Sequence, residues 1–383
     1  MRALREAFGA NFSAGLEAGA AVCVFHRGVE LADFFGGFAD ATGEREWRRD
    51  TPVLVWSATK APASACLLHA LQERGVGPDL RVADVWPEFA GAGKDRVTVR
   101  QVMSHCAGLC ALDGPVPEMM DREAVVVAIE SQRPLVPVGE GPAYSPRVFG
   151  FFLDEMVRRL SGGEPLGDYW RRVFAGPMGL DFWIGVPDEE QSRIADVIAP
   201  KAPAGGEEDK EFLRAFADAG SLARRAFSSP KGLGAISAMN QAEVRGACLP
   251  AMGGIGTARA LAEFHAMLAA GGDWNGRRFF GSEAMSWIAE RVVDGFDKVL
   301  RRRMAFSCGF SLDPLDGDGV KLRQSFGPEA GAFGHAGAGG SVVFADPQNE
   351  IGFAYVMNRM EGGVLPGERC LSLVRAVYQE LRG

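Results

Sequence analysis

The chain has 383 residues, of which 47% are hydrophobic and 23% are charged, and its formal net charge is −8. A chain of this length and composition can bury a large core as one two-lobed domain or two packed domains, which argues against wholesale disorder. The acidic balance argues against a nucleic-acid partner, because such partners normally meet a basic face.

The distribution of cysteines and of apolar residues bears on the cellular compartment of the protein. The seven cysteines are scattered without a CxxC pair, so neither a zinc ribbon nor a disulfide scaffold is indicated. The first 17 residues form an amphipathic stretch that lacks the unbroken apolar core of a signal peptide. The longest strongly apolar run near the middle, residues 124–129, is far too short to cross a bilayer. We therefore expect a cytoplasmic protein with no membrane partner.

The N-terminal part predicts a hairpin followed by a helix. Residues 20–25 are an apolar run and residues 29–35 partly alternate, so with a turn at 26–28 they predict two antiparallel strands. A strand-like run over 53–56 precedes a segment, 57–74, in which small and apolar residues recur at helical spacing.

The middle of the chain is mostly helical, and strand character returns toward the end. Residues 200–209 are rich in Pro, Gly and charge, which predicts an exposed loop. The clearest predicted helices are 122–132, 149–160, 211–225, 257–270 and a closing helix over about 365–381. The late strands are predicted over 304–312, 341–345 and 351–358.

This order of elements predicts an α+β fold. An antiparallel sheet is built from both termini and flanked by helices, with a large, mostly helical insertion between its parts. We expect residues 1–78 and 300–383 to form one lobe with the central sheet, and residues 79–299 to form a mostly helical lobe. The cleft between the two lobes is then the natural place for an active site.

A serine and a lysine stand three residues apart at the start of the predicted 57–74 helix, in Ser57-Ala58-Thr59-Lys60. Residues at this spacing share a helix face, so the amine can approach the hydroxyl. The helix N-terminus favours anionic character at the serine oxygen. A partly desolvated lysine has a lowered pKa and can take the serine proton. The pattern therefore predicts Ser57 as a nucleophile with Lys60 as a proton-handling partner.

Two further motifs follow, Tyr144-Ser145-Pro146 and His335-Ala336-Gly337. With the S-x-x-K motif, they make the sequence resemble the serine β-lactamase and penicillin-binding superfamily, specifically the class C β-lactamases and the related family VIII carboxylesterases. The second motif stands in the position of the family's Tyr-x-Asn, and the third in that of its Lys-Thr-Gly or His-x-Gly box. The resemblance covers nearly the whole chain and implies a β-lactamase/transpeptidase-like fold.

The resemblance also implies a role for each matching residue. Ser57 would attack the acyl carbon, and Lys60 would take or relay its proton. Tyr144, as phenol or phenolate, would protonate the leaving group and later activate water. Which of Lys60 and Tyr144 is the base in acylation stays open. The backbone N–H groups of Ser57 and Ala338 would form the oxyanion hole. The expected substrate-binding residues are His335, Gly337 and Pro146, and no cofactor or metal is implied.

Two departures from the β-lactamase pattern bear on the substrate. Pro146 replaces the asparagine amide that would bond the side-chain carbonyl of a β-lactam, and His335 replaces the lysine that would hold its carboxylate. Neither change affects the nucleophile. We therefore expect a carboxylesterase that cleaves small acyl esters, with weak β-lactam hydrolysis left open. The alternatives on this fold are a D-amino-acid peptidase or amidase, an acyltransferase, a β-lactamase and a non-catalytic sensor module. The oligomeric state is not indicated.

Other catalytic patterns are absent or weak. No Gly-x-Ser-x-Gly occurs, so the α/β-hydrolase nucleophile elbow has no candidate. Ser104 and His105 are adjacent in the chain and do not point at each other, which favours a structural histidine. The histidines are dispersed without HExxH, so we expect no catalytic metal. Several mid-chain aromatic residues could line an acyl pocket, although core packing is the favoured interpretation: Tyr169, Trp170, Phe174, Phe182 and Trp183.

Overall fold

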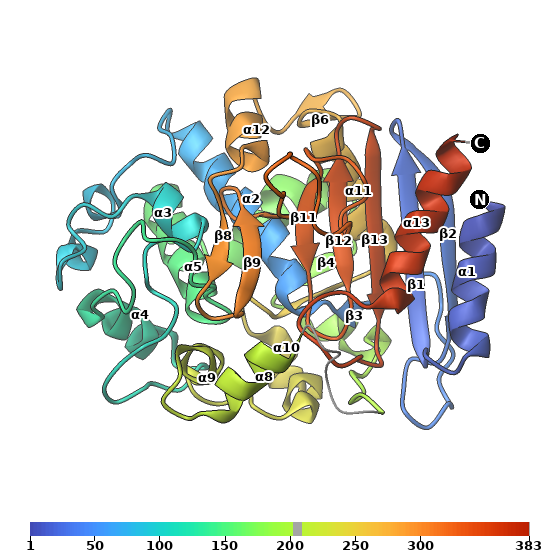
Figure 1. The fold of residues 1–383 in the computed structure, drawn as a ribbon, viewed down its shortest axis with the longest axis horizontal. Helices are drawn as coiled ribbons and strands as arrows, with labels where there is room; N and C mark the ends of the chain where they lie inside the picture. The colour runs from blue at the N-terminus through green and yellow to red at the C-terminus, as the bar shows by residue number, and fades with distance from the viewer. Residues whose placement is uncertain (202–208, 383) are drawn as a thin grey trace.

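The structure, a computed structural model, describes residues 1–201 and 209–382. Its central feature is an eight-stranded antiparallel sheet with the order β2-β1-β13-β12-β11-β10-β9-β8 (Figure 1). Strands from the two ends of the chain meet inside it, since β1 (Gly19–His26) pairs with β13 (Ile351–Met357) along its length. The predicted α+β fold, with an antiparallel sheet built from both termini, is confirmed.

The N-terminal hairpin forms as predicted. β1 and β2 (Val29–Gly37) pair antiparallel, and both Arg27 and Gly28 adopt a positive φ in the turn between them. β1 is apolar throughout rather than alternating because both faces of the sheet are covered. Ala21, Cys23 and Phe25 belong to one core cluster, while the residues between them belong to another. A strand buried on both faces has no solvent side on which to place polar residues.

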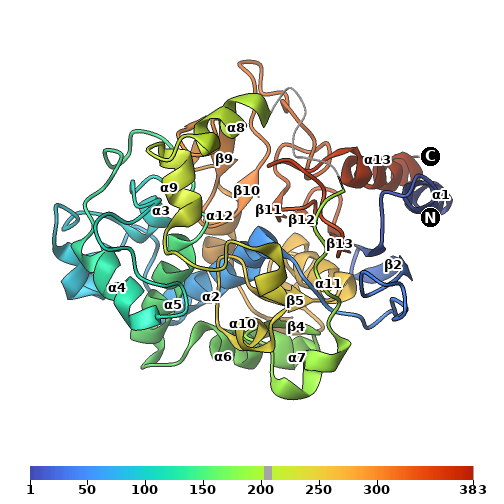
Figure 2. The same cartoon turned by 90° about the horizontal axis from the view of Figure 1, so that it is seen from below.

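Helices form the layers on either side of the sheet. α1 (Arg2–Ser13) and α13 (Glu368–Arg382) pack together on one face, and α11 (Ala258–Ala269) covers β1, β12 and β13 on the other (Figure 2). The remaining strands of the sheet are β12 (Val342–Asp346), β11 (Phe333–Ala336), β10 (Ser311–Leu312), β9 (Arg302–Phe306) and β8 (Val293–Asp297).

Two smaller sheets and the other helices complete the described residues. A three-stranded sheet has the order β3 (Val53–Leu54), β5 (Gly254–Gly256) and β4 (Phe182–Ile184), and a two-stranded one joins β6 (Asp273–Trp274) to β7 (Arg277–Arg278). The helices not yet named are α2 (Lys60–Glu73), α3 (Val99–Met103), α4 (Arg122–Ser131), α5 (Val148–Ser161), α6 (Leu166–Trp170), α7 (Gly176–Met178), α8 (Lys210–Ala217), α9 (Leu222–Ser228), α10 (Ala242–Gly246) and α12 (Ser282–Ala289).

Three predicted elements are divided in the structure. The segment 57–74 begins with a 3₁₀ turn, Trp56–Thr59, before α2 starts. The predicted helix 211–225 is two helices, because the Ser221 hydroxyl caps α9 by accepting the Arg224 N–H at 3.1 Å. The predicted strand 304–312 is interrupted at Gly309, whose φ is +83°. The helical or strand pattern of apolar residues continues across each of these breaks, so the pattern alone could not locate the breaks.

The central helix α2 is the element that positions the site. Nearly all of its residues are buried, and it contacts α5, α6 and α12 as well as the 3₁₀ turn. Its many alanines allow these neighbours to approach closely. Packing along the whole of α2 therefore fixes the position of its N-terminal end.

Of the predicted loop 200–209, residues 202–208 lie outside the described residues. Among the helices that are described, none combines the length and the apolar character needed to cross a bilayer.

Candidate active site

Ser57 lies just before the N-terminus of α2, in a turn that follows β3 and is hydrogen-bonded to β5. The Val55 N–H donates to the Gly254 carbonyl at 3.0 Å, and the Gly254 N–H donates to the Thr59 hydroxyl at 2.8 Å. Trp56, the residue before the serine, has a φ of +50°. A non-glycine residue in this region is strained, and such strain persists where the surroundings fix the backbone. The turn thus presents Ser57 in one defined orientation.

Lys60 lies directly behind the serine and is fully buried. Its Nζ is 3.2 Å from the Ser57 Oγ, 3.1 Å from the Pro146 carbonyl oxygen and 2.7 Å from the Ala251 carbonyl oxygen. Among the described residues no carboxylate forms an ion pair with it. Burial therefore holds the pKa of the Lys60 amine well below its ordinary value.

Tyr144 reaches the same point from the loop before α5. Its ring centroid is 5.0 Å from the Lys60 Nζ, and it lines the same cavity as Ser57. Burial of the ring raises the pKa of the phenol, while the neighbouring Ser57 side chain opposes the shift and the nearby Asp297 carboxylate adds to it. Tyr144 is therefore a protonated phenol at neutral pH.

The His335-Ala336-Gly337 motif forms the end of β11 and the following turn. The ring of His335 lies 6.2 Å from that of Tyr144, and its Nδ1–H donates to the Ala336 carbonyl at 2.8 Å. Burial, and secondly the charge of Lys60, lowers the pKa of His335 to about 3. The imidazole is therefore neutral at physiological pH.

Gly337 packs against the chain that leads into the nucleophile. A Cβ at this position would lie 2.1 Å from the Val55 carbonyl oxygen, so only glycine fits. The Gly337 N–H donates to the Ser341 carbonyl at 2.7 Å, which closes the turn. This contact brings the exposed Ala338 alongside the Ser57 turn.

A cavity of about 250 Å³ opens in front of the serine. Four of the residues predicted for the site line it: Ser57, Tyr144, His335 and Ala338. The other three lie behind this surface, where Lys60 contacts Ser57 from within, Pro146 supplies a carbonyl to Lys60, and Gly337 supports the turn. The other apolar side chains of the lining are Phe212, Phe216, Phe227, Leu300, Met304, Leu312, Phe326, Ala336, Val364, Leu365 and Pro366.

The mid-chain aromatic residues form a separate cluster in the core. The Trp170 ring is 5.3 Å from Phe174 and 5.5 Å from Phe182, and Tyr169 hydrogen-bonds the ring of His69 at 2.8 Å. None of them is among the cavity-lining residues that the structure describes. Three of the phenylalanines that line the cavity come instead from α8 and α9, and a fourth is Phe326; the sequence analysis singled out none of them for the site.

Two buried residues that hold Tyr144 were also missed. The Asp297 carboxylate, at the end of β8, accepts the Tyr144 N–H at 2.9 Å and the N–H groups of Val299 and Leu300 at 2.8 and 2.7 Å. Burial raises the pKa of Asp297 to about 6, against the effect of these three bonds. An isolated aspartate before Lys298 gives no sequence signal of this role.

His105 is the second of them. Its Nδ1 accepts the Ser145 N–H at 3.2 Å, and its ring lies 4.8 Å from that of Tyr144. Ser104 points elsewhere and donates to the Arg100 carbonyl at 2.8 Å. In the described residues no cluster of three His, Cys, Asp or Glu side chains is arranged to hold a metal ion.

Comparisons with known proteins agree with this geometry. The beta-lactamase family model matches residues 8–369. The esterase/beta-lactamase LipL of Mycobacterium tuberculosis is 30% identical over 359 residues, which cover 92% of this chain and 80% of that protein. A penicillin-binding protein homologue from Caulobacter crescentus is 35% identical, with a TM-score of 0.86. A family VIII carboxylesterase is 32% identical, with a TM-score of 0.87. Each of these two structures aligns over 99% of this chain and 96% of its own. The chain therefore belongs to the beta-lactamase family and is a hydrolase of that fold.

Proposed function

We propose that this protein is a serine carboxylesterase that cleaves small carboxylic esters through an acyl-enzyme on Ser57. The observation that carries the proposal is the distance of 3.2 Å between the Lys60 Nζ and the Ser57 Oγ. A neutral amine has two N–H groups, and the carbonyls of Pro146 and Ala251 can accept both. The remaining lone pair then faces the serine hydroxyl, ready to accept its proton.

The acylation step follows from this arrangement. The Ser57 O–H proton passes to the Lys60 amine while Oγ forms a bond to the ester carbonyl carbon, whose π electrons move onto oxygen. When this tetrahedral intermediate collapses, the bond to the alkoxy group breaks. Tyr144, held as a phenol by its raised pKa, gives its proton to the leaving alkoxide and regains one from the Lys60 ammonium. We therefore propose Lys60 as the base of acylation.

Deacylation reverses the roles. Water attacks the acyl carbon as its proton passes into the Lys60–Tyr144 pair, and Ser57 recovers a proton when the acid departs. In both steps the negative carbonyl oxygen is held by the backbone N–H groups of Ser57 and Ala338, which the contact between Gly337 and Val55 keeps together.

Two features favour esters over β-lactams. His335 is neutral, so it offers no charge to the carboxylate of a β-lactam. Pro146 has no side-chain amide, and its carbonyl is occupied by Lys60. The relatives support ester hydrolysis as such, since they include an esterase/beta-lactamase and a family VIII carboxylesterase.

The test is the hydrolysis of p-nitrophenyl acetate and butyrate, with nitrocefin and a D-alanyl amide measured on the same preparation. Ser57→Ala should abolish ester turnover, and Ser131→Ala, which changes an exposed serine on α4, should leave it intact. Intact-mass measurement should find one acyl group per chain in wild type and none in Ser57→Ala. Equal ester turnover by wild type and Ser57→Ala would refute the proposal.

A further inference from the structure

Three phenylalanine rings from α8 and α9 form a compact wall of the active-site cavity, here called the aromatic wall: Phe212, Phe216 and Phe227. The Phe212 ring is 5.6 Å from each of the other two, and those are 5.9 Å apart. One pair is stacked at 30°, and the other two pairs meet edge to face at 68° and 82°. All three residues line the same cavity as Ser57.

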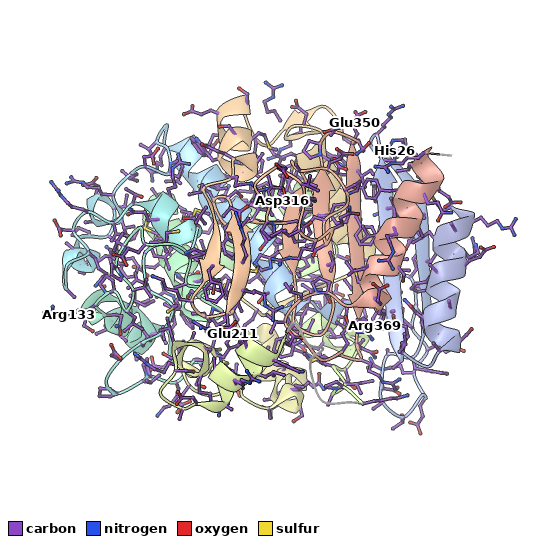
Figure 3. All side chains as sticks on the ribbon, in the orientation of Figure 1. His26, Arg133, Glu211, Asp316, Glu350 and Arg369 are labelled. Atoms are coloured by element: carbon purple, nitrogen blue, oxygen red, sulfur yellow. The ribbon has the colours of Figure 1, made fainter. Side chains whose placement is uncertain are left out.

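The aromatic wall is fixed to the sheet by ion pairs. Arg302 of β9 pairs with Asp209 at 2.6 Å, and both side chains are almost fully buried. Arg301 pairs with Glu211 of α8 at 2.7 Å. Figure 3 labels Glu211 on α8, and Figure 2 shows α8 and α9 next to β9. The rings are therefore held at a defined place beside the site.

The wall also leaves apolar surface open to a ligand. Phe212 is buried, whereas Phe216 and Phe227 are only partly buried and face the cavity. The charged groups of the lining are already engaged, since Asp313 pairs with Lys321 at 3.0 Å and Arg323 donates to the Arg303 carbonyl at 3.0 Å. Outside the lining, the Arg224 guanidinium lies over the Phe216 ring, 4.8 Å from its centroid, and the surface that Phe216 and Phe227 present to the cavity itself is aromatic.

The cavity has room for a ring as well as an ester group. Its volume of about 250 Å³ exceeds the roughly 150 Å³ in which an apolar cavity of another protein binds benzene. Aromatic rings gain from stacked and edge-to-face contacts beyond the area that they bury, by about twofold to tenfold in affinity for each ring pair.

We propose that the aromatic wall is a subsite for a flat aromatic ring, so that the preferred substrates are esters with an aryl group close to the ester bond. This inference rests on the proposed esterase function and narrows its substrate class. The ring occupies the subsite while the carbonyl carbon meets the Ser57 Oγ. Phe216 and Phe227 are then specificity-determining residues that play no part in proton transfer.

Isomeric esters provide the test. Benzyl acetate carries the ring on the alcohol, and methyl phenylacetate carries it on the acyl group. The two esters have the same molecular formula. Cyclohexylmethyl acetate and methyl cyclohexylacetate replace the flat ring with a saturated one, and ethyl acetate has no ring. Titration of the released acid measures kcat/KM for all five in the same way.

The variants are Phe216→Leu and Phe227→Leu, which keep an apolar side chain but remove the aromatic face. Phe35→Leu, on β2 and outside the cavity lining, is the matched control. We expect wild type to prefer one aryl isomer over its cyclohexyl counterpart by about fivefold or more. Phe216→Leu and Phe227→Leu should remove most of this preference and leave ethyl acetate within about twofold, and Phe35→Leu should change neither value.

Each result has one meaning. Loss of the aryl preference in the wall variants alone supports the subsite. Turnover of all five esters with no aryl preference in wild type, or with a preference unchanged in both wall variants, overturns the subsite and leaves the esterase function standing. Failure of wild type to hydrolyse any ester overturns the proposed function, and the subsite falls with it.

Discussion

The guanidinium of Arg369 donates a hydrogen bond of 2.8 Å to the carbonyl oxygen of Gly339. Arg369 lies in the first turn of α13, where Figure 3 labels it, and only 4% of it is exposed. Gly339 directly follows Ala338 in the turn after β11 and has a φ of +85°. A helix on the outer face of the sheet therefore holds the turn that carries a predicted oxyanion donor.

The same guanidinium connects this turn to the N-terminal part of the chain. Its Nη1 donates to the Leu16 carbonyl at 3.1 Å and to the Arg359 carbonyl at 2.9 Å, and it pairs with the Glu17 carboxylate at 3.3 Å. The Glu361 N–H is a second donor to Gly339, at 3.0 Å. Arg369 is thus a positioning residue for the oxyanion turn.

We expect Arg369→Lys to lower kcat by about tenfold while KM stays within about twofold, because a displaced oxyanion donor weakens the transition state more than the bound substrate. Arg375→Lys, an exposed position on the same helix, should change neither constant. Steady-state kinetics with p-nitrophenyl acetate, together with thermal unfolding, would check this. A Tm loss in Arg369→Lys with unchanged kcat would mean that Arg369 serves stability alone.

Lys60→Met should reduce kcat/KM by about 10²- to 10⁴-fold, because it removes the base and keeps an apolar stem of similar length. Lys94→Met is the matched control, since Lys94 is also buried and its Nζ also makes three hydrogen bonds, all of them to carbonyl oxygens, but it lies outside the cavity lining. It should alter stability rather than activity. Similar activity losses in the two variants, measured on folded protein, would contradict the role of Lys60.

The pH profile of wild type follows from the same amine. Because the pKa of Lys60 is lowered, the neutral, active form persists well below pH 10.5. The acid limb of kcat/KM should therefore rise through a pKa far below that of an ordinary lysine. A profile from stopped-flow hydrolysis of p-nitrophenyl acetate with its midpoint near 10.5 would contradict the lowered pKa of Lys60.

The Asp297 carboxylate should make stability depend on pH. Its folded pKa of about 6 lies above the unfolded value of 3.8, so the folded state binds the proton more tightly and its stability falls as pH rises from about 4 to about 6. This contribution is about 3 kcal/mol. The difference in unfolding free energy between wild type and Asp297→Asn, from urea titrations, should change over that window. Asp318→Asn, at an exposed position, is the control, and a flat difference for Asp297→Asn would contradict the shift.

Gly337→Ala should lower kcat/KM at least tenfold, because its Cβ would lie 2.1 Å from the Val55 carbonyl oxygen and displace the chain before Ser57. The φ of this glycine is not positive, so the effect is purely one of space. Gly331→Ala, where an added Cβ meets no atom within 4 Å, should change activity less than twofold. Ester kinetics and Tm for both variants would check this, and equal activity in the two would contradict the contact.

The grouping of Ser57, Lys60, Tyr144 and His335 in one place could be predicted because it is local or rests on short motifs. Ser57 and Lys60 are three residues apart, and the motifs around Tyr144 and His335 are distinctive. Asp297 and His105 were not predictable as partners of Tyr144, because each acts through a backbone N–H group of the tyrosine loop. Such contacts depend on the folded path of the backbone and leave no side-chain pattern.

The fold was predictable to the level of its elements. Apolar runs located β1 and β13, partial alternation located β2, and helical periodicity located α11, because each of these patterns follows from which faces of the element are buried. The aromatic wall was missed because the spacing of Phe212 and Phe216 is the same whether a helix faces a core or a cavity. Only the tertiary arrangement decides between these two cases.

The pairing of β1 with β13 has a consequence for synthesis of the chain. Ser57 and Lys60 leave the ribosome before the turn that carries Ala338 and before β13, the strand that pairs with β1 in the large sheet. Closing a sheet between such distant segments is slow, because the loop between them must first be ordered. The Ser57–Lys60 pair is therefore made before the turn that carries Ala338, and the site is complete only when β13 has joined the sheet.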